Sequence, residues 1–230
     1  MADWGKHKFL IVQILKDIYS DLELSRYLGF KGGTALMLFY ELPRFSVDLD
    51  FNLLDLDKSA TVYNKVRNIL LNYGRIRDEA AKFHGLILVL DYGSNERNLK
   101  IEISNRQFND SYETKGFLGI QMKVMRLEDM FAHKLCALLD RNMLANRDIF
   151  DCYFFLQRRT QANKEIVEAR MHVKFDTYLE KCIQTLEGIA GQSLLNGLGE
   201  LMDDDLKKFV RSHLKQEVIT LLKMYKDILL

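Results

Sequence analysis

The sequence predicts an α+β fold, in which a mixed sheet flanked by helices is followed by an all-helical C-terminal lobe. Strand-like alternation of apolar and polar residues is confined to the first part of the chain, and from Leu127 onward only helical patterns occur. This change predicts two lobes, residues 1–125 and 126–230. The chain has one proline among 230 residues, which favours long helices because proline is a strong helix breaker.

The first lobe combines both kinds of pattern, and the spacing of its apolar residues predicts eight elements. The expected helices are 7–19, Ala35–Leu42 and 58–72, and the expected strands are Tyr27–Phe30, Ser46–Leu53, Gly85–Tyr92, Asn98–Ser104 and 118–125, of which the first could instead be a turn. We expect Thr34 to cap the second helix, which ends before Pro43. Gly93-Ser94-Asn95 suits a turn and predicts a hairpin of Gly85–Tyr92 with Asn98–Ser104.

The second lobe shows helical patterns throughout. The expected helices are 127–141 and 147–158, and residues 161–230 are helix-forming. The acidic run Asp203-Asp204-Asp205 is well placed to begin a helix that ends near the C-terminus, because acidic side chains stabilise a helix N-terminus.

Composition excludes several classes of protein. With 48% hydrophobic and 28% charged residues the chain is neither disordered nor fibrous, and its net charge of +1 disfavours a purely electrostatic nucleic-acid binder. The three cysteines lack CxxC spacing, so neither a zinc site nor a disulfide framework is indicated. No apolar run is long enough to span a bilayer. We therefore expect a soluble cytoplasmic protein without a membrane partner.

A glycine turn opens one of the predicted helices. Gly32 and Gly33 precede Thr34, and paired glycines before a helix N-terminus let backbone amides approach an anion closely. Taken alone, such a pair is more often an ordinary turn.

Acidic residues mark two of the predicted strands. Asp48 and Asp50 point the same way on the strand Ser46–Leu53, and two carboxylates so close repel one another unless a cation lies between them. Oxygen ligands favour Mg²⁺ or Mn²⁺. Glu102, on a later strand, could supply a third carboxylate. The alternative is a solvated polar strand face, for the aspartates and for Glu102.

Together these features predict one site. The glycine turn would hold nucleotide phosphates, and the carboxylates would hold a metal ion that bridges them, as phosphoryl transfer requires. In the second lobe Lys134 and Arg141 are two helical turns apart, and Asp148 and Asp151 are also spaced to share a helix face. These charges could face a triphosphate. The alternative is a cluster of ion pairs between helices.

The sequence resembles the AbiEii-type nucleotidyltransferase toxins, of the DNA polymerase β-like nucleotidyltransferase superfamily. Three ordered motifs over about residues 28–156 carry the resemblance, each a short run of residues. They are Lys31-Gly32-Gly33-Thr34-Ala35-Leu36 with Arg44-Phe45-Ser46-Val47-Asp48-Leu49-Asp50-Phe51, then Leu99-Lys100-Ile101-Glu102-Ile103-Ser104, then Leu127 to Arg141 with Arg147-Asp148-Ile149-Phe150-Asp151-Cys152-Tyr153.

The resemblance implies a nucleotidyltransferase fold and a role for each site residue. Phosphate contacts are implied for Gly32, Gly33, Thr34, Ser46, Lys134 and Arg141; metal binding for Asp48, Asp50 and Glu102; and catalysis for Asp48, Asp50, Lys134 and Asp148. The implied reaction is Mg²⁺- or Mn²⁺-dependent transfer of a nucleoside monophosphate (NMP) from a nucleoside triphosphate (NTP) to an RNA, with tRNA favoured, or to a protein.

The resemblance also implies a biological setting and leaves alternatives. The protein would be the toxin of a toxin–antitoxin or phage-abortive-infection system, with a cognate antitoxin as a possible partner. The helical lobe would complete the NTP and acceptor site. Basic residues that could face an RNA acceptor occur in both lobes, and are Lys115, Lys123, Arg126, Arg158, Arg159, Lys164 and Arg170. The alternatives are a small-molecule nucleotidyltransferase, as for antibiotics, and a non-catalytic NTP-binding module of the same fold.

Overall fold

The computed structural model describes residues 3–93, 96–140, 144–189 and 194–229. The chain divides into two compact units, of which the first comprises residues 1–41, 46–107 and 111–125 and the second comprises 42–45, 108–110 and 126–230. The main division therefore falls after Met125. Two short segments of the N-terminal half nevertheless belong to the second unit.

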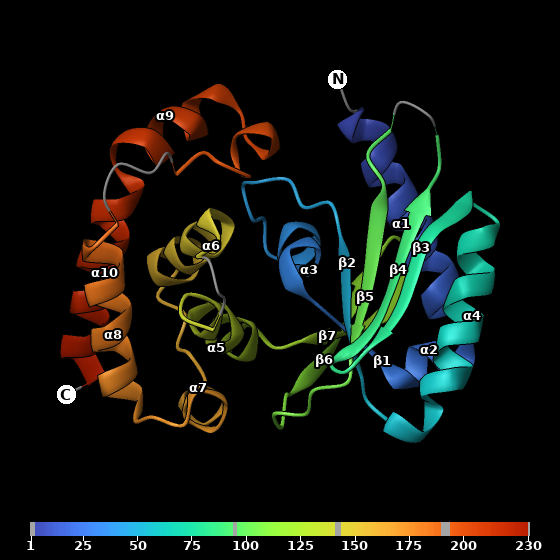
Figure 1. Cartoon of the computed structure of the whole chain (residues 1–230), viewed down its shortest axis with the longest axis horizontal. Helices are drawn as coiled ribbons and strands as arrows, with labels where there is room; N and C mark the ends of the chain where they lie inside the picture. Colours follow the sequence, from blue (N-terminus) through green and yellow to red (C-terminus); the bar gives the residue numbers. More distant parts are fainter. Residues whose placement is uncertain (1–2, 94–95, 141–143, 190–193, 230) are drawn as a thin grey trace. The chain divides into compact units, whose positions relative to one another are not determined.

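The first unit is a sheet with helices on both faces. Its helices are α1 (Trp4–Ser20), α2 (Leu22–Tyr27), α3 (Gly32–Phe39) and α4 (Ser59–Leu71), with a short 3-10 helix at Leu56–Lys58. Its strands are β1 (Leu28–Lys31), β2 (Leu49–Leu53), β3 (Arg75–Lys82), β4 (Gly85–Asp91), β5 (Leu99–Ser104), β6 (Tyr112–Phe117) and β7 (Ile120–Met125). Helices α1, α2 and α4 lie together on one face of the sheet, and α3 lies on the other (Figure 1).

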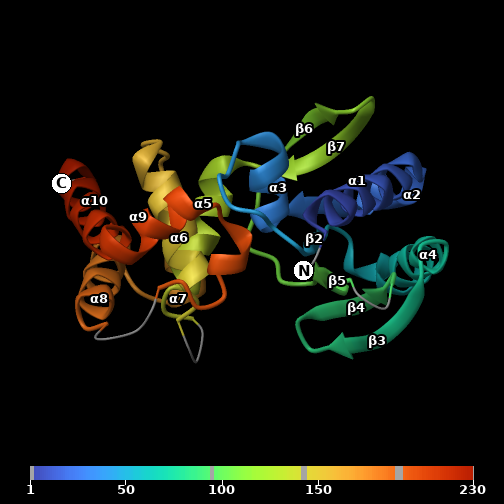
Figure 2. The same ribbon diagram turned by 90° about the horizontal axis from the view of Figure 1, so that it is seen from above.

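The seven strands form one mixed sheet in the order β3-β4-β5-β2-β1-β7-β6. Strand β2 lies near its centre, antiparallel to β1 and parallel to β5. The hairpins β3–β4 and β6–β7 form the two edges (Figure 2). The predicted mixed sheet is confirmed, as is the antiparallel pairing of β4 with β5. Ser94 and Asn95 of the predicted turn lie outside the described residues.

Three elements of this unit were not expected from the sequence. Both edge strands, β3 and β6, are exposed or half-buried along their length, so they lack the apolar alternation that predicts a strand. Helix α2 has only one fully buried residue, Leu24, and is too short for a clear helical period. The other predicted elements of the first part are present with shifted ends.

The prediction around the glycine turn was wrong in its boundaries. Helix α3 begins at Gly32, and Lys31 holds the N-cap position instead of Thr34. The helix ends at Phe39, not at Leu42, because the segment 42–45 leaves the first unit. Strand β2 accordingly begins only at Leu49, and the three residues before it are irregular.

The predicted apolar face of this strand is confirmed by burial, although Ser46 and Asn52 on the predicted polar face are buried as well. Val47, Leu49, Phe51 and Leu53 are all buried. The ring of Phe51 lies 5.4 Å from that of Phe30 on the neighbouring strand, and burying one such side chain contributes about 1.5–3 kcal/mol. This apolar face holds the intervening Asp50 on the opposite face of the sheet.

The second unit is helical. Its elements are α5 (Leu127–Ala137), α6 (Asn146–Gln157), α7 (Lys164–Met171), α8 (Phe175–Glu187), a 3-10 turn at Gly199–Leu201, α9 (Asp204–Ser212) and α10 (Leu214–Leu229). The rings of Phe131 and Phe155 stack in its core, 4.9 Å apart. Helix α5 stops short of the predicted end at residue 141. Asp203 caps α9 through the backbone N–H of Leu206, and His213 separates α9 from α10, where one helix was expected.

None of the described helices has the length and apolar character needed to cross a membrane.

Candidate active site

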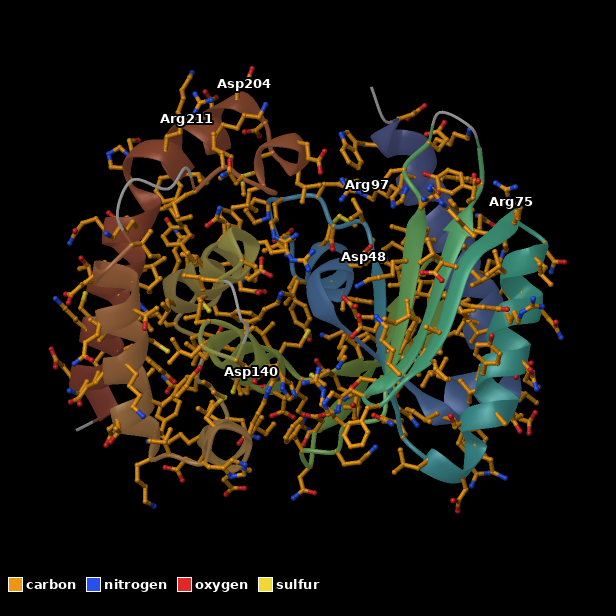
Figure 3. The ribbon with its side chains drawn as sticks, viewed as in Figure 1. Asp48, Arg75, Arg97, Asp140, Asp204 and Arg211 are labelled. Carbon is orange, nitrogen blue, oxygen red and sulfur yellow. The ribbon has the colours of Figure 1, made fainter. Side chains whose placement is uncertain are left out.

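Two predicted metal ligands are neighbours in the sheet of the first unit. Asp50 on β2 pairs in register with Glu102 on β5 and with Lys31 on β1. Residues paired in register project from the same face of a sheet, so Asp50 and Glu102 point the same way. Asp48, labelled in Figure 3, comes directly before β2 and lies at the same end of the sheet as Lys100. The structure thus gathers the three acidic residues that the sequence singled out.

A lysine lies among these carboxylates. The Nζ of Lys100 is 3.0 Å from Oε2 of Glu102 and 3.9 Å from Oδ2 of Asp48. Burial alone would lower the pKa of Lys100, but the charges of Asp48, Asp50 and Glu102 outweigh it and raise that pKa. The ammonium therefore stays charged and offsets part of the repulsion among the acids.

The two paired acids respond differently to this surrounding. For Asp50 burial is the largest influence and raises the pKa; the charge of Lys100 opposes it, and Asp48 and Glu102 add to it. For Glu102 burial also acts to raise the pKa, but Lys100 overcomes it and the pKa is lowered. Asp50 is thus the carboxylate whose charge is least compensated, which is the situation that a bound cation relieves.

The glycine turn touches Asp50 directly. Gly32 has a φ of +80°, a conformation that favours glycine, and a Cβ there would lie 2.4 Å from Oδ2 of Asp50. No other residue fits this position without moving the carboxylate. The backbone of the turn and the acid of β2 therefore form one surface at the start of α3.

The two predicted hydroxyl contacts are buried beside this surface. Thr34 is fully buried, and its Oγ1 donates a hydrogen bond to the backbone carbonyl of Asp48. Ser46 is buried two residues before Asp48. Thr34 thus holds the backbone of the Asp48 segment against α3. Phosphate contacts by Thr34, Ser46 and Gly33 stay predictions.

A histidine fixes the same segment from the other side. The Nε2–H of His7, on α1, donates a hydrogen bond of 2.9 Å to the carbonyl of Val47. Its Nδ1 accepts a hydrogen bond from the hydroxyl of Tyr92. Burial is the main cause of the lowered pKa of His7, which keeps the ring neutral and suits this pattern. This contact holds the backbone next to Asp48.

The other predicted site residues form a charge cluster in the helical unit. The Nζ of Lys134 on α5 lies 2.9 Å from Oδ1 of Asp148 and 2.7 Å from Oδ2 of Asp151, both on α6. Asp151 also accepts two hydrogen bonds of 2.7 Å from the guanidinium of Arg44, in the segment 42–45 of the same unit. Two cations and two carboxylates thus balance in charge.

Charge pairing outweighs burial in this cluster. Burial acts to raise the pKa of Asp151, but Arg44 and Lys134 lower it to about 2. Burial acts to lower the pKa of Lys134, but the two aspartates raise it. Asp148 is fully buried, whereas 17% of the Lys134 side chain is exposed. Both alternatives named from the sequence therefore stay open for Lys134. Arg141 lies outside the described residues.

Several basic residues expected to face RNA are held by contacts within their own units. Lys115 pairs with Glu113 at 3.1 Å, and Lys123 donates to a backbone carbonyl at 2.9 Å. Arg170 pairs with Asp140, which Figure 3 labels in the helical unit. These side chains are less available to an acceptor than the sequence indicated.

Comparison with known families decides the identity. A family model described as the nucleotidyl transferase AbiEii toxin of type IV toxin–antitoxin systems matches residues 13–223. The chain belongs to the AbiEii nucleotidyltransferase toxin family. The resemblance drawn from the motifs is therefore confirmed, and this AbiEii protein is a nucleotidyltransferase. Membership implies an NTP substrate and an antitoxin partner.

Solved structures support the same fold. A protein from H. pylori, described as a candidate nucleotidyltransferase, is 23% identical, with a TM-score of 0.58 over 97% of this chain and 95% of its own. JHP933 from Helicobacter pylori is 22% identical, with a TM-score of 0.51 over 100% and 98%. A comparison with curated proteins found no match. The predicted nucleotidyltransferase fold is confirmed for this AbiEii protein.

The carboxylate cluster of this AbiEii protein consists of oxygen donors that suit a hard divalent cation. Among the described residues no group of three His, Cys, Asp or Glu side chains is arranged so that it could hold a metal ion. At the cluster, the ammonium of Lys100 lies between Asp48 and Glu102. The donors are carboxylate oxygens of the kind Mg²⁺ and Mn²⁺ prefer, and Gly32 approaches Asp50 so closely that a Cβ there would collide with its carboxylate. The chemistry of these donors suits such an ion.

Proposed function

We propose that this AbiEii protein transfers an NMP from an NTP to an RNA hydroxyl, with tRNA the favoured acceptor, and releases pyrophosphate. The observation that carries the proposal is the placement of Asp50, which pairs with Glu102 and follows Asp48 by two residues, against the glycine turn at Gly32. A turn that presents backbone next to converging carboxylates suits a metal-bound triphosphate.

In the proposed reaction each residue has a limited task. An acceptor hydroxyl gives its proton to water as its oxygen bonds to the α-phosphorus, the bond to the oxygen that bridges to the β-phosphorus breaks, and pyrophosphate leaves with that oxygen. Asp48 and Asp50 would hold Mg²⁺ or Mn²⁺, with Glu102 as a further oxygen ligand. The bound ion would neutralise developing charge on the phosphates. The backbone at Gly32 and Gly33 would orient the triphosphate.

In the helical unit, Lys134 would supply a positive charge, and the aspartates that pair with it would hold it in place. We assign Lys134 to contact with the triphosphate, because its side chain is partly exposed and its charge is secured by two carboxylates. Asp148 is fully buried, which favours a positioning role through Lys134 over contact with the substrate. Arg141 would be a further phosphate contact.

The experiment uses NTPs labelled with ³²P at either the α or the γ phosphate, with total RNA, Mg²⁺ and purified protein. We expect label on RNA from the α-labelled NTP only, and none with Asp48→Asn. If label appears on protein, or on a small molecule in a cell extract, that molecule and not RNA is the acceptor. Absence of any transfer with Mg²⁺ and Mn²⁺ alike would contradict the proposal.

A cell-based test separates a toxin from a small-molecule enzyme. Expression of the wild-type chain should arrest growth, and Asp48→Ala should abolish the arrest. Antibiotic resistance without growth arrest would favour transfer to a small molecule.

A further inference from the structure

Lys100 lies at the carboxylate cluster, and the proposed reaction gives it no task. It lies on β5 two positions before Glu102, so its side chain leaves the same face of the sheet. Its Nζ lies 3.0 Å from Oε2 of Glu102 and 3.9 Å from Oδ2 of Asp48, so it contacts both acids. The ammonium is therefore placed among the groups that would ligate a metal ion.

The charges explain why a cation belongs there. Asp48, Asp50 and Glu102 carry three negative charges on adjacent parts of β2 and β5, and carboxylates this close repel one another. Lys100 is the cation that acts most strongly on both Asp50 and Glu102. Its charge therefore offsets more of the repulsion among these acids than that of Lys31, which also acts on both.

A divalent cation and this ammonium would compete for the same carboxylates. Mg²⁺ needs carboxylate oxygens at about 2.0–2.1 Å in a nearly octahedral arrangement. Two cations beside the same acids would also repel each other. Contact of the ammonium with these acids therefore weakens binding of the metal ion.

We propose that Lys100 is an internal counter-ion of the carboxylate cluster, which holds the acids together before a divalent cation binds and competes with that cation for them. The proposal rests on the metal site of the proposed function. It predicts that removing the ammonium tightens metal binding and lowers the stability of the metal-free protein.

The test is binding of Mn²⁺ to purified wild-type and Lys100→Met protein without nucleotide, followed by electron paramagnetic resonance of free Mn²⁺. Because Lys100 is one-third exposed and its charge is partly screened, we expect Mn²⁺ to bind about five- to tenfold more tightly to Lys100→Met. The thermal midpoint of Lys100→Met should fall without metal and recover with Mn²⁺. Lys100→Arg, which keeps the charge, should bind Mn²⁺ much as the wild type does. If Lys100→Met does not fold, Lys100→Gln takes its place.

Lys65 offers a matched control on the same unit. Its Nζ also bridges two acids, at 2.8 Å from Asp21 and 2.7 Å from Glu23. Lys65→Met should leave Mn²⁺ affinity unchanged, and an equal gain there would reduce the effect to net charge and overturn the inference.

The two proposals fail in different ways. Equal Mn²⁺ affinity in wild type and Lys100→Met, with binding lost in Asp48→Asn, would overturn the counter-ion role and leave the metal site standing. Absence of Mn²⁺ binding in both proteins would overturn the metal site and the counter-ion role together.

Discussion

The guanidinium of Arg44 donates two hydrogen bonds of 2.7 Å to the carboxylate of Asp151, although the two residues are 107 positions apart. Both side chains are almost completely buried, at 3% and 0% exposure. Arg44 stands four residues before Asp48 in the motif, yet it belongs to the helical unit while Asp48 belongs to the sheet unit. One short motif thus contributes to the interior of one unit and to the candidate site of the other.

Loss of this pair should destabilise the helical unit strongly. In Arg44→Gln the carboxylate of Asp151 keeps only Lys134 as a charged partner, and breaking a buried pair costs about 3–5 kcal/mol. Urea denaturation followed by circular dichroism measures the change. Arg67→Gln is the control, because the pair of Arg67 with Glu79 is on the surface and its loss should not shift the midpoint. Equal midpoints for Arg44→Gln and the wild type would refute a stabilising role.

The stability of the folded protein should depend on pH through the protonation of Asp151. Its pKa in the folded protein is lowered to about 2, so its contribution is fully present above the ordinary carboxyl range near pH 4 and is lost as the pH falls toward 2. The depressed pKa corresponds to about 2 kcal/mol. Urea midpoints of wild type and Asp151→Asn, measured from pH 6 to pH 2, should converge at the acid end. A constant difference across that range would contradict this assignment.

Gly32→Ala should impair both folding and transfer. An added Cβ meets Oδ2 of Asp50 at 2.4 Å, and the φ of +80° is strained for alanine by about 1–2 kcal/mol. Gly119→Ala is matched, since Gly119 has a φ of +85° and nothing within 4 Å of its Cβ position. Both variants should lose similar stability from the backbone, but only Gly32→Ala should lose at least tenfold in transfer rate by displacing Asp50. Equal activity of the two variants would show that the contact with Asp50 is unimportant.

Asp50→Asn should stabilise the protein while abolishing transfer. The raised pKa of Asp50 means that its charged form is unfavourable in the fold, through burial first and repulsion from Asp48 and Glu102 next. Because the folded-state pKa is above the ordinary value, this cost is present at pH 7 and disappears as the pH falls below that pKa. The thermal midpoint of Asp50→Asn without metal should therefore exceed that of the wild type at pH 7. A lower midpoint would argue against this view.

Asp91→Asn provides the comparison for that measurement. Asp91 pairs with Arg75, and this hydrogen-bonded pair lowers the pKa of Asp91. Its neutral variant should therefore give no increase in midpoint.

The sequence by itself determined which side chains share a face. The alternation over 46–53 placed the apolar side chains in the core, and the period of two then put Asp48 and Asp50 together. The ordered motifs also indicated the family, which the match over residues 13–223 confirms. These features are readable because they depend on neighbours within a few residues.

Where the local signal was weak, prediction from the sequence failed. The edge strands β3 and β6 bury too little to show a period, and α3 starts at Gly32 because Lys31 ends a strand paired with β2. Thr34 suits a helix cap by its residue type, but its hydroxyl bonds to the carbonyl of Asp48. In both cases, the start of α3 at Gly32 and the hydrogen bond of Thr34, a residue distant in the sequence decided the outcome.

Only the tertiary structure decided which distant residues meet. The register of β2 against β5 sets Asp50 beside Glu102, the turn at Gly32 closes on Asp50, and Lys100 enters between the acids. Arg44 meets Asp151 only because the segment 42–45 belongs to the helical unit. The physical reason is that periodicity encodes the face on which a side chain lies, whereas strand register and long-range ion pairs arise from the packing of the whole chain.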